Sequence, residues 1–139
     1  TLLRAPRGAG HIAVLAANGI GERESNVLHA VAGRVPREMS APSRDYDEDD
    51  WQEQLDALAA RGLVDAEGSL TSAGADLKAQ IEDSTDRLAL RAFDALDDRQ
   101  LGILFAALTP LTRLVVAGGD VPADTPMGLN RDVLDDDAL

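Results

Sequence analysis

The densest group of side chains that could do chemistry is an acidic run, residues 45–56, which contains seven carboxylates and no basic residue. Four of these acids fall at positions 1, 3, 5 and 12 of a calcium-binding EF-hand loop, namely Asp45, Asp47, Asp49 and Asp56. The calcium pattern fails, because Asp50 stands where the loop needs glycine and an apolar helical stripe already begins at Trp51. The acids instead suit the positive N-terminal end of a helix, and a docking surface for a basic partner is the alternative.

The two histidines, His11 and His29, are the candidates for metal binding or proton transfer. They lack an H-x-x-x-H or similarly clustered spacing, so we expect no metal site. Polar histidines at the surface or at an interface are the simpler interpretation. The alternative is a ligand pocket that contains them and is completed by a region N-terminal to this chain.

A small polar group interrupts the apolar seam of a predicted long helix at Ser84 and Thr85. Arg87 lies one helical turn from Asp83, and an exposed pair of this kind contributes only about 0.3–0.5 kcal/mol. Ser84 and Arg87 could instead bind a ligand or fix the register of two packed helices. The candidate ligand-binding residues are therefore His11, His29, Ser84 and Arg87.

The sequence carries no enzyme or cofactor motif. It has no G-x-S-x-G or dinucleotide-binding glycine pattern, and the string RGAGH at residues 7–11 lacks both the lysine and the spacing of a phosphate-binding loop. Cysteine is absent, which excludes disulfides, thiol catalysis and cysteine zinc sites. We therefore expect no catalytic residues, cofactor or metal. An enzyme remains an alternative only if a missing N-terminal domain completes its site.

Composition and charge narrow the class of protein. Apolar residues make up 45% of the 139 residues but aromatic residues only 3%, which favours helices packed through Leu, Val, Ile and Ala. The net charge of −12 repels nucleic acid and anionic membranes. Arg, Gly or Pro interrupts the longest apolar stretches before they reach membrane-spanning length. We expect a soluble, cytoplasmic protein without a membrane span, and one that is a piece of a longer chain.

Apolar spacing predicts three helices in the first half of the chain. The first covers residues 9–18, a short second helix lies between residues 21 and 33, and a third covers residues 47–62 with an acidic first turn. Pro36 and Pro42 limit the segment before the third helix to a turn or one turn of helix. Residues 45–74 read as a helix, a very short hairpin and a second helix, which is the order found in winged-helix DNA-binding domains.

The second half is predicted to contain a short hairpin followed by two or three helices. Residues 63–71 offer two three-residue apolar arms, a minimal hairpin. Thr71 or Ser72 then caps a long helix that runs to about residue 96. Asp97 and Gln100 form a capping box, and the helix that follows is kinked or restarted at Pro110. Residues 120–139 are rich in Pro, Gly and Asp and are predicted to be an arm or a disordered tail.

The strings VLHAVAGRVPREMS and WQEQLDALAARGLVDAEGSLTSAGADL resemble the winged-helix core of the MarR-type regulators. The residues in that register are Leu55, Leu58, Arg61, Gly62, Leu63, Val64, Leu70, Thr71, Gly74 and Leu77. The chain also resembles a family of uncharacterised actinobacterial helix-turn-helix proteins, through the strings GHIAVLAANG, ESNVLHAVAGRVPRE, LTSAGADLKAQIEDSTDRL and PMGL. This resemblance covers residues 10–129, which are similar to the C-terminal half of the proteins in that family. The MarR resemblance implies a third helix in the major groove, a wing beside it and terminal helices that form a dimer. Neither resemblance implies an enzymatic activity.

These observations predict a mainly α fold in residues 1–119, with a winged-helix-like core, a minimal two-stranded wing, a long helix and a C-terminal helical pair. A DNA reader needs Lys or Arg to displace counterions, so the acidic third helix predicts a degenerate module for protein interaction or small-ligand binding. The alternative is a dimeric MarR-like regulator that binds DNA through four arginines, Arg34, Arg37, Arg44 and Arg61. The long and C-terminal helices are predicted to bind a second copy or the missing N-terminal domain.

Overall fold

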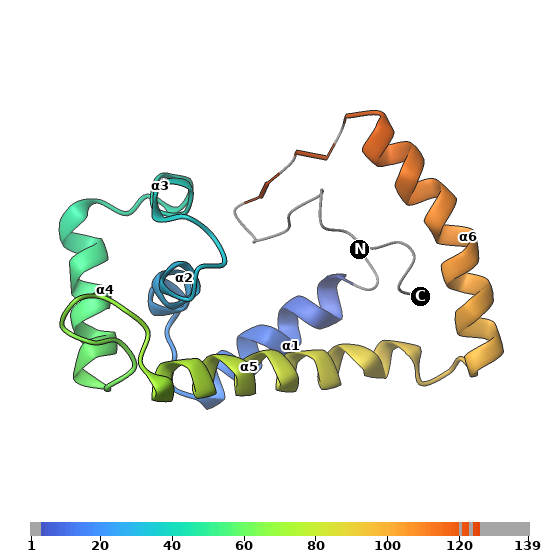
Figure 1. The fold of residues 1–139 in the computed structure, drawn as a ribbon. Coiled ribbons are helices and arrows are strands. Elements are labelled where there is room, and N and C mark those ends of the chain that lie inside the picture. Colours follow the sequence, from blue (N-terminus) through green and yellow to red (C-terminus); the bar gives the residue numbers. More distant parts are fainter. Residues whose placement is uncertain (1–3, 120, 123, 126–139) are drawn as a thin grey trace. The chain divides into compact units, whose positions relative to one another are not determined.

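The computed structural model describes residues 4–119, 121, 122, 124 and 125 of the chain (Figure 1). It divides into two compact units, Thr1–Ala92 and Phe93–Leu139. The elements in chain order are α1 (Arg4–Ala17), α2 (Glu22–Val31), α3 (Arg37–Ser40), a 3-10 turn η1 (Pro42–Arg44), α4 (Glu48–Ala60), α5 (Ser72–Leu90), a 3-10 turn η2 (Arg91–Phe93) and α6 (Asp98–Ala117). The mainly helical class predicted from the sequence is therefore confirmed.

The first unit is built from two helical layers that share one core. Helix α1 lies along α5, while α2 packs against both α3 and α4 (Figure 1). The side chains that are almost fully buried come from α2, α4 and α5, and they are Val27, Leu28, Leu58, Ile81 and Thr85. These side chains join α2, α4 and α5 in one core, and α2 also contacts α3.

Helix α4 begins and ends where the sequence predicts. The Asp47 side chain accepts a hydrogen bond from the Asp50 backbone N–H at 2.8 Å, so it caps the helix. At the other end Gly62 adopts a φ of 71°, which a residue without a Cβ takes at little cost. Trp51 is 3% exposed and packs edge-on against Tyr46, with ring centroids 5.5 Å apart. The inner face of α4 is therefore fixed in the core.

Helix α5 is capped by Thr71, as predicted. The Thr71 hydroxyl oxygen accepts from the Gly74 backbone N–H at 3.0 Å, and the hydroxyl donates to the Gly62 carbonyl at 2.7 Å. The helix ends at Leu90, earlier than the predicted end near residue 96, and η2 follows it. The single Thr71 side chain thus ties the start of α5 to the end of α4.

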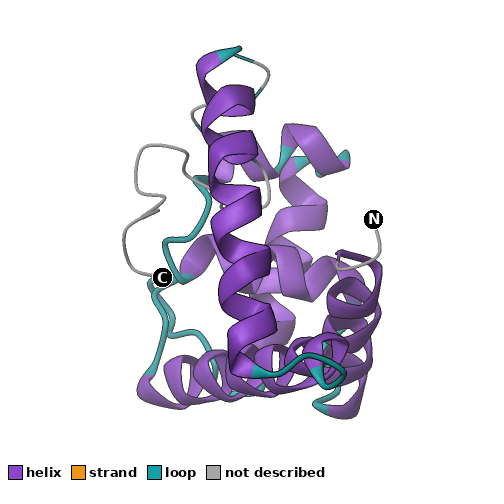
Figure 2. Cartoon of the chain, turned by 90° about the vertical axis from the view of Figure 1, so that its right-hand side faces the viewer, coloured by secondary structure: helices purple, strands orange, loops and turns teal. Residues whose placement is uncertain are grey.

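The predicted two-stranded wing is wrong. The segment that links α4 to α5 contains one isolated antiparallel bridge, between Val64 and Leu70, and Figure 2 shows helices and loops without strands in the described chain. The Asp65 carboxylate accepts hydrogen bonds from the backbone N–H groups of Glu67 and Ser69, at 3.1 and 2.7 Å. These local bonds close a tight turn, and the cap of α5 at Thr71 leaves no residues to extend the pairing. The described fold is an all-α helix-turn-helix arrangement.

The second unit contains α6, which is one helix where a helical pair was predicted. Its capping box is confirmed: Asp97 accepts from the Gln100 N–H at 2.7 Å, and Gln100 accepts from the Asp97 N–H at 2.9 Å. The helix continues through Pro110, which removes one backbone hydrogen bond without ending it. The prediction of a C-terminal helical pair is therefore corrected to a single helix, Asp98–Ala117.

Helix α6 is also the one helix of the described residues that is long and apolar enough to cross a membrane, with a mean hydropathy of 1.6. The helix contains Pro110 and Arg113. The prediction of no membrane span treats residues of these types as interruptions of the apolar stretches. Long apolar helices in soluble proteins share these properties when a partner covers them. Of the predicted arm at residues 120–139, most lies outside the described residues, so the division into residues 1–119 and 120–139 stays a prediction.

Candidate functional site

Helix α4 presents an acidic surface to solvent. We call this surface the α4 face, and it consists of Glu48, Asp49, Gln52, Glu53 and Asp56, all of which are exposed. The opposite side of the same helix carries the buried Trp51 and Leu58. Because the core fixes the rotation of α4, the acids cannot turn away from an approaching partner. In a helix-turn-helix protein this outward side of the last helix is the one that would enter a DNA groove.

Two of the four arginines predicted to bind DNA are held by the protein itself. The Arg37 guanidinium forms an ion pair with Glu48 at 2.6 Å and lies 5.1 Å from the centre of the Trp51 ring. Arg61 donates hydrogen bonds to the backbone carbonyls of Asn18 and Gly19, at 2.9 and 2.7 Å. Both side chains therefore position α4 against its neighbours. Arg34 and Arg44 are exposed and form no ion pair with any described residue.

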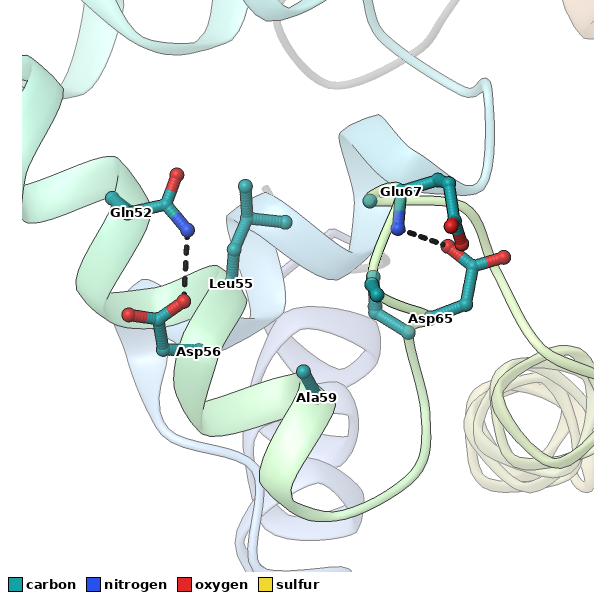
Figure 3. A pocket seen from close by; sticks show the side chains of 9 residues that line it. Gln52, Leu55, Asp56, Ala59, Asp65 and Glu67 are labelled. Carbon is teal, nitrogen blue, oxygen red and sulfur yellow. Dashed lines mark hydrogen bonds between the residues drawn. The ribbon is translucent and has the colours of Figure 1, made fainter.

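A cleft of about 200 Å³ lies between α4 and the turn formed by residues 64–68 (Figure 3). Leu55 and Ala59 of α4 lie across from Asp65 and Glu67 of the turn in this view. The full lining is Gln52, Leu55, Asp56, Ala59, Val64, Asp65, Ala66, Glu67 and Gly68. Ligand pockets for small molecules usually have volumes of about 300–1,000 Å³, so this cleft is small for one. The cleft was not predicted from the sequence, which placed a flat hairpin at this position.

The structure joins His11 to Thr85 across the α1 and α5 interface. The His11 Nδ1 and the Thr85 Oγ1 are 3.0 Å apart, and the Thr85 hydroxyl donates to the Ile81 carbonyl at 2.8 Å. Since that hydroxyl uses its hydrogen on Ile81, it must accept from His11, which places the imidazole hydrogen on Nδ1. Thr85 is fully buried. His11 therefore satisfies a buried hydroxyl, a structural role.

The charges of Lys78 and Glu82 act on both His29 and His11. Burial lowers the pKa of His29, Lys78 lowers it further, and Glu82 acts in the opposite direction. Burial likewise lowers the pKa of His11, against an opposing effect of Glu82. Lys78 donates a hydrogen bond to Glu82, one helical turn away on α5. Lys78 and Glu82 were missed from the sequence, although their i, i+4 spacing was a signal for a paired surface.

Ser84 and Arg87, the other two candidate ligand-binding residues, lie apart from this pair of histidines in their contacts. The Arg87 guanidinium donates to the Ser84 hydroxyl at 2.9 Å. The expected pair of Arg87 with Asp83 is replaced by this bond within one turn of α5. Arg87 is exposed, so the contact is a surface hydrogen bond. The structure thus brings His11 close to Thr85 and leaves Ser84 with Arg87.

Acid is expected to weaken the first unit through its histidines. Because both histidine pKa values are lowered in the fold, the unfolded chain takes up protons first, near pH ~6.5. The contribution of the two neutral histidines to the free energy of unfolding is complete above that pH and is lost as the pH falls below it. The free energy of unfolding, measured in urea at about pH 7.5 and 5.5, should fall more for the native chain than for a His11→Gln and His29→Gln double variant. Equal falls in the two proteins would contradict this account.

The sequence model of a helix-turn-helix family matches residues 1–122. The chain belongs to this helix-turn-helix family. Nothing among the curated proteins or the solved structures matches it. Membership of this family indicates a helix-turn-helix module of the DNA-binding type. The family match does not extend to a MarR-type or an actinobacterial group.

Proposed function

We propose that this helix-turn-helix module binds a protein partner through the α4 face and does not read DNA bases. The observation that carries the proposal is the acidic, rigidly oriented α4 face. A helix that enters a DNA groove gains affinity by releasing counterions to basic side chains, and each carboxylate on that helix adds repulsion from the phosphates. The net charge of −12 strengthens this repulsion at long range.

The arrangement of the arginines supports the same conclusion. A DNA-binding alternative would need Arg34, Arg37, Arg44 and Arg61 to reach phosphates. Arg37 and Arg61 would first have to break the contacts by which they hold α4. That leaves Arg34 and Arg44 as the free pair, and two phosphate contacts give a weak and salt-sensitive attraction.

The proposal can be tested by selecting binders to the full chain from a random 12-residue peptide display library at about 150 mM salt, where surface charges are screened beyond about 8 Å. We expect recovered peptides to lose at least tenfold in affinity for an Asp49→Arg and Glu53→Arg variant. An Asp76→Arg and Asp83→Arg variant is the matched control, because it changes the charge equally on the exposed side of α5.

Comparison of the two variants distinguishes binding at the α4 face from attraction to the overall negative charge of the chain. Loss of binding in the α4 variant with retention in the α5 variant supports the α4 face. Equal loss in both variants, or a library that yields no binder, would overturn the proposal.

We also propose that α6 pairs with α6 of a second copy. Its apolar side chains are exposed, and Leu108, Leu111 and Val115 keep 39%, 57% and 49% of their surface. Side chains of this kind on one long helix usually mark an interaction surface. A homodimer would bury them and would present two α4 faces.

A further inference from the structure

We propose that the cleft between α4 and residues 64–68 receives one arginine or lysine side chain from a basic segment of the protein partner. This inference rests on the proposed function, and it specifies the chemistry of the partner. The volume of the cleft is the first reason. At about 200 Å³ it is below the usual range for small-molecule pockets, about 300–1,000 Å³, so it suits a single inserted side chain.

Part of the lining of the cleft is apolar. Leu55 and Ala59 line it from α4 (Figure 3), and Val64, which is 4% exposed, lines it from the turn. Long basic side chains bury their aliphatic stems along apolar surface and keep the charged end in water. The aliphatic stem of an arginine or lysine could therefore pack against these three side chains.

The rim of the cleft is acidic, and the described residues place no basic side chain in its lining. Three carboxylates belong to the lining, on Asp56, Asp65 and Glu67. The Asp65 carboxylate is held by two backbone N–H groups, and Asp56 accepts from the Gln52 amide at 2.8 Å. The Glu67 carboxylate forms no hydrogen bond or ion pair with any described residue. A guanidinium or ammonium group in the cleft could form a charge-assisted hydrogen bond with the unpaired Glu67 carboxylate, and the held carboxylates of Asp56 and Asp65 would add attraction.

These features also set the orientation of the partner. The α4 face continues from the rim at Asp56 toward Asp49 along the same side of the helix. A basic segment could therefore place one side chain in the cleft and lay further basic residues along the α4 face. The cleft would act as the anchor, and the α4 face would supply less specific attraction.

The test uses peptides recovered by display on the full chain, labelled and measured by fluorescence anisotropy. We expect an arginine or lysine in every tight binder, and at least a tenfold loss when that residue is replaced by citrulline or norleucine. The Ala59→Leu variant fills the cleft from an exposed helical position, and Glu67→Gln removes the unpaired carboxylate. Each should weaken binding at least tenfold, while an Asp76→Asn variant, which removes an exposed carboxylate from α5, should weaken it less than threefold.

Helical content of the three variants, measured by circular dichroism, should match the native chain, so that loss of binding reports on the cleft. Binding that is lost in the Asp49→Arg and Glu53→Arg variant but is unchanged by Ala59→Leu and Glu67→Gln would overturn the cleft and leave the protein-binding function standing. A library that yields no binder would overturn both.

Discussion

Replacing Gly74 with alanine is expected to lower the free energy of unfolding by about 3 kcal/mol or more. Gly74 is buried in the first turn of α5, and a Cβ at this position would lie 2.1 Å from the Leu63 carbonyl oxygen and 2.8 Å from a methyl carbon of Leu70. The oxygen belongs to the backbone, so it cannot move aside as a side chain would. The substitution would push α5 away from the segment that links it to α4.

A Gly8→Ala variant is the matched control for this result. Gly8 lies within α1 of the same unit, and apart from its two neighbours and the nearby backbone of α1, no atom of the described residues comes within 4 Å of a Cβ added there. The same substitution should therefore stabilise the chain by about 0.5–1 kcal/mol through helix propensity. Urea unfolding followed by circular dichroism measures both effects. A Gly74→Ala chain as stable as the native protein would show that α5 does not approach residue 63 this closely.

A Leu111→Glu substitution is expected to weaken self-association of the chain by at least about 100-fold, because a buried unpaired charge costs several kcal/mol. Leu111 lies at the centre of an apolar stripe with a spacing of three and four residues, Leu104, Leu108, Leu111 and Val115. If this stripe meets its copy in a second chain, a carboxylate at its centre would be buried without a partner. Light scattering over a range of concentrations should then report the mass of one chain, 14.7 kDa, in place of two.

An Ala106→Glu variant tests whether the stripe itself is responsible. Residue 106 is exposed, and helical geometry places it on the side of α6 opposite to the stripe. This variant should still dimerise. A native chain that is monomeric at about 100 µM, a concentration at which an interface with a Kd near 1 µM would be occupied, would contradict the proposed pairing. Sedimentation of the native chain with lipid vesicles through α6 would also contradict the proposed pairing.

The beginnings of α4, α5 and α6 could be predicted because caps are local, whereas α1 begins at Arg4, earlier than the predicted residue 9. Asp47, Thr71 and the pair of Asp97 with Gln100 each accept or donate hydrogen bonds within three residues. Sequence spacing alone therefore identifies them. The absent wing shows the opposite case. Two apolar arms predict strands, but the Asp65 side chain bonds to backbone groups of its own turn and ends the pairing after one bridge.

The candidate site could be predicted in its charge but not in its shape. The acids of α4 are visible in the sequence, and apolar spacing correctly turns Trp51 inward and the acids outward. The cleft depends on how the turn at Asp65 folds back toward Leu55, a tertiary contact with no periodic signal. The same limit applies to His11 and Thr85, which are 74 residues apart in sequence and 3.0 Å apart in space.

The central claim is that the acidic α4 face converts a DNA-binding type of fold into a protein-binding one. The most direct test is retention of random genomic DNA fragments by the native chain in a gel shift at about 50 mM and then about 200 mM salt, because attraction to phosphates is strongest at low salt. The account predicts no retention at either salt concentration. Recovery of a palindromic sequence at the lower concentration, with affinity that falls steeply at the higher one, would show that the arginines outweigh the acids and would contradict it.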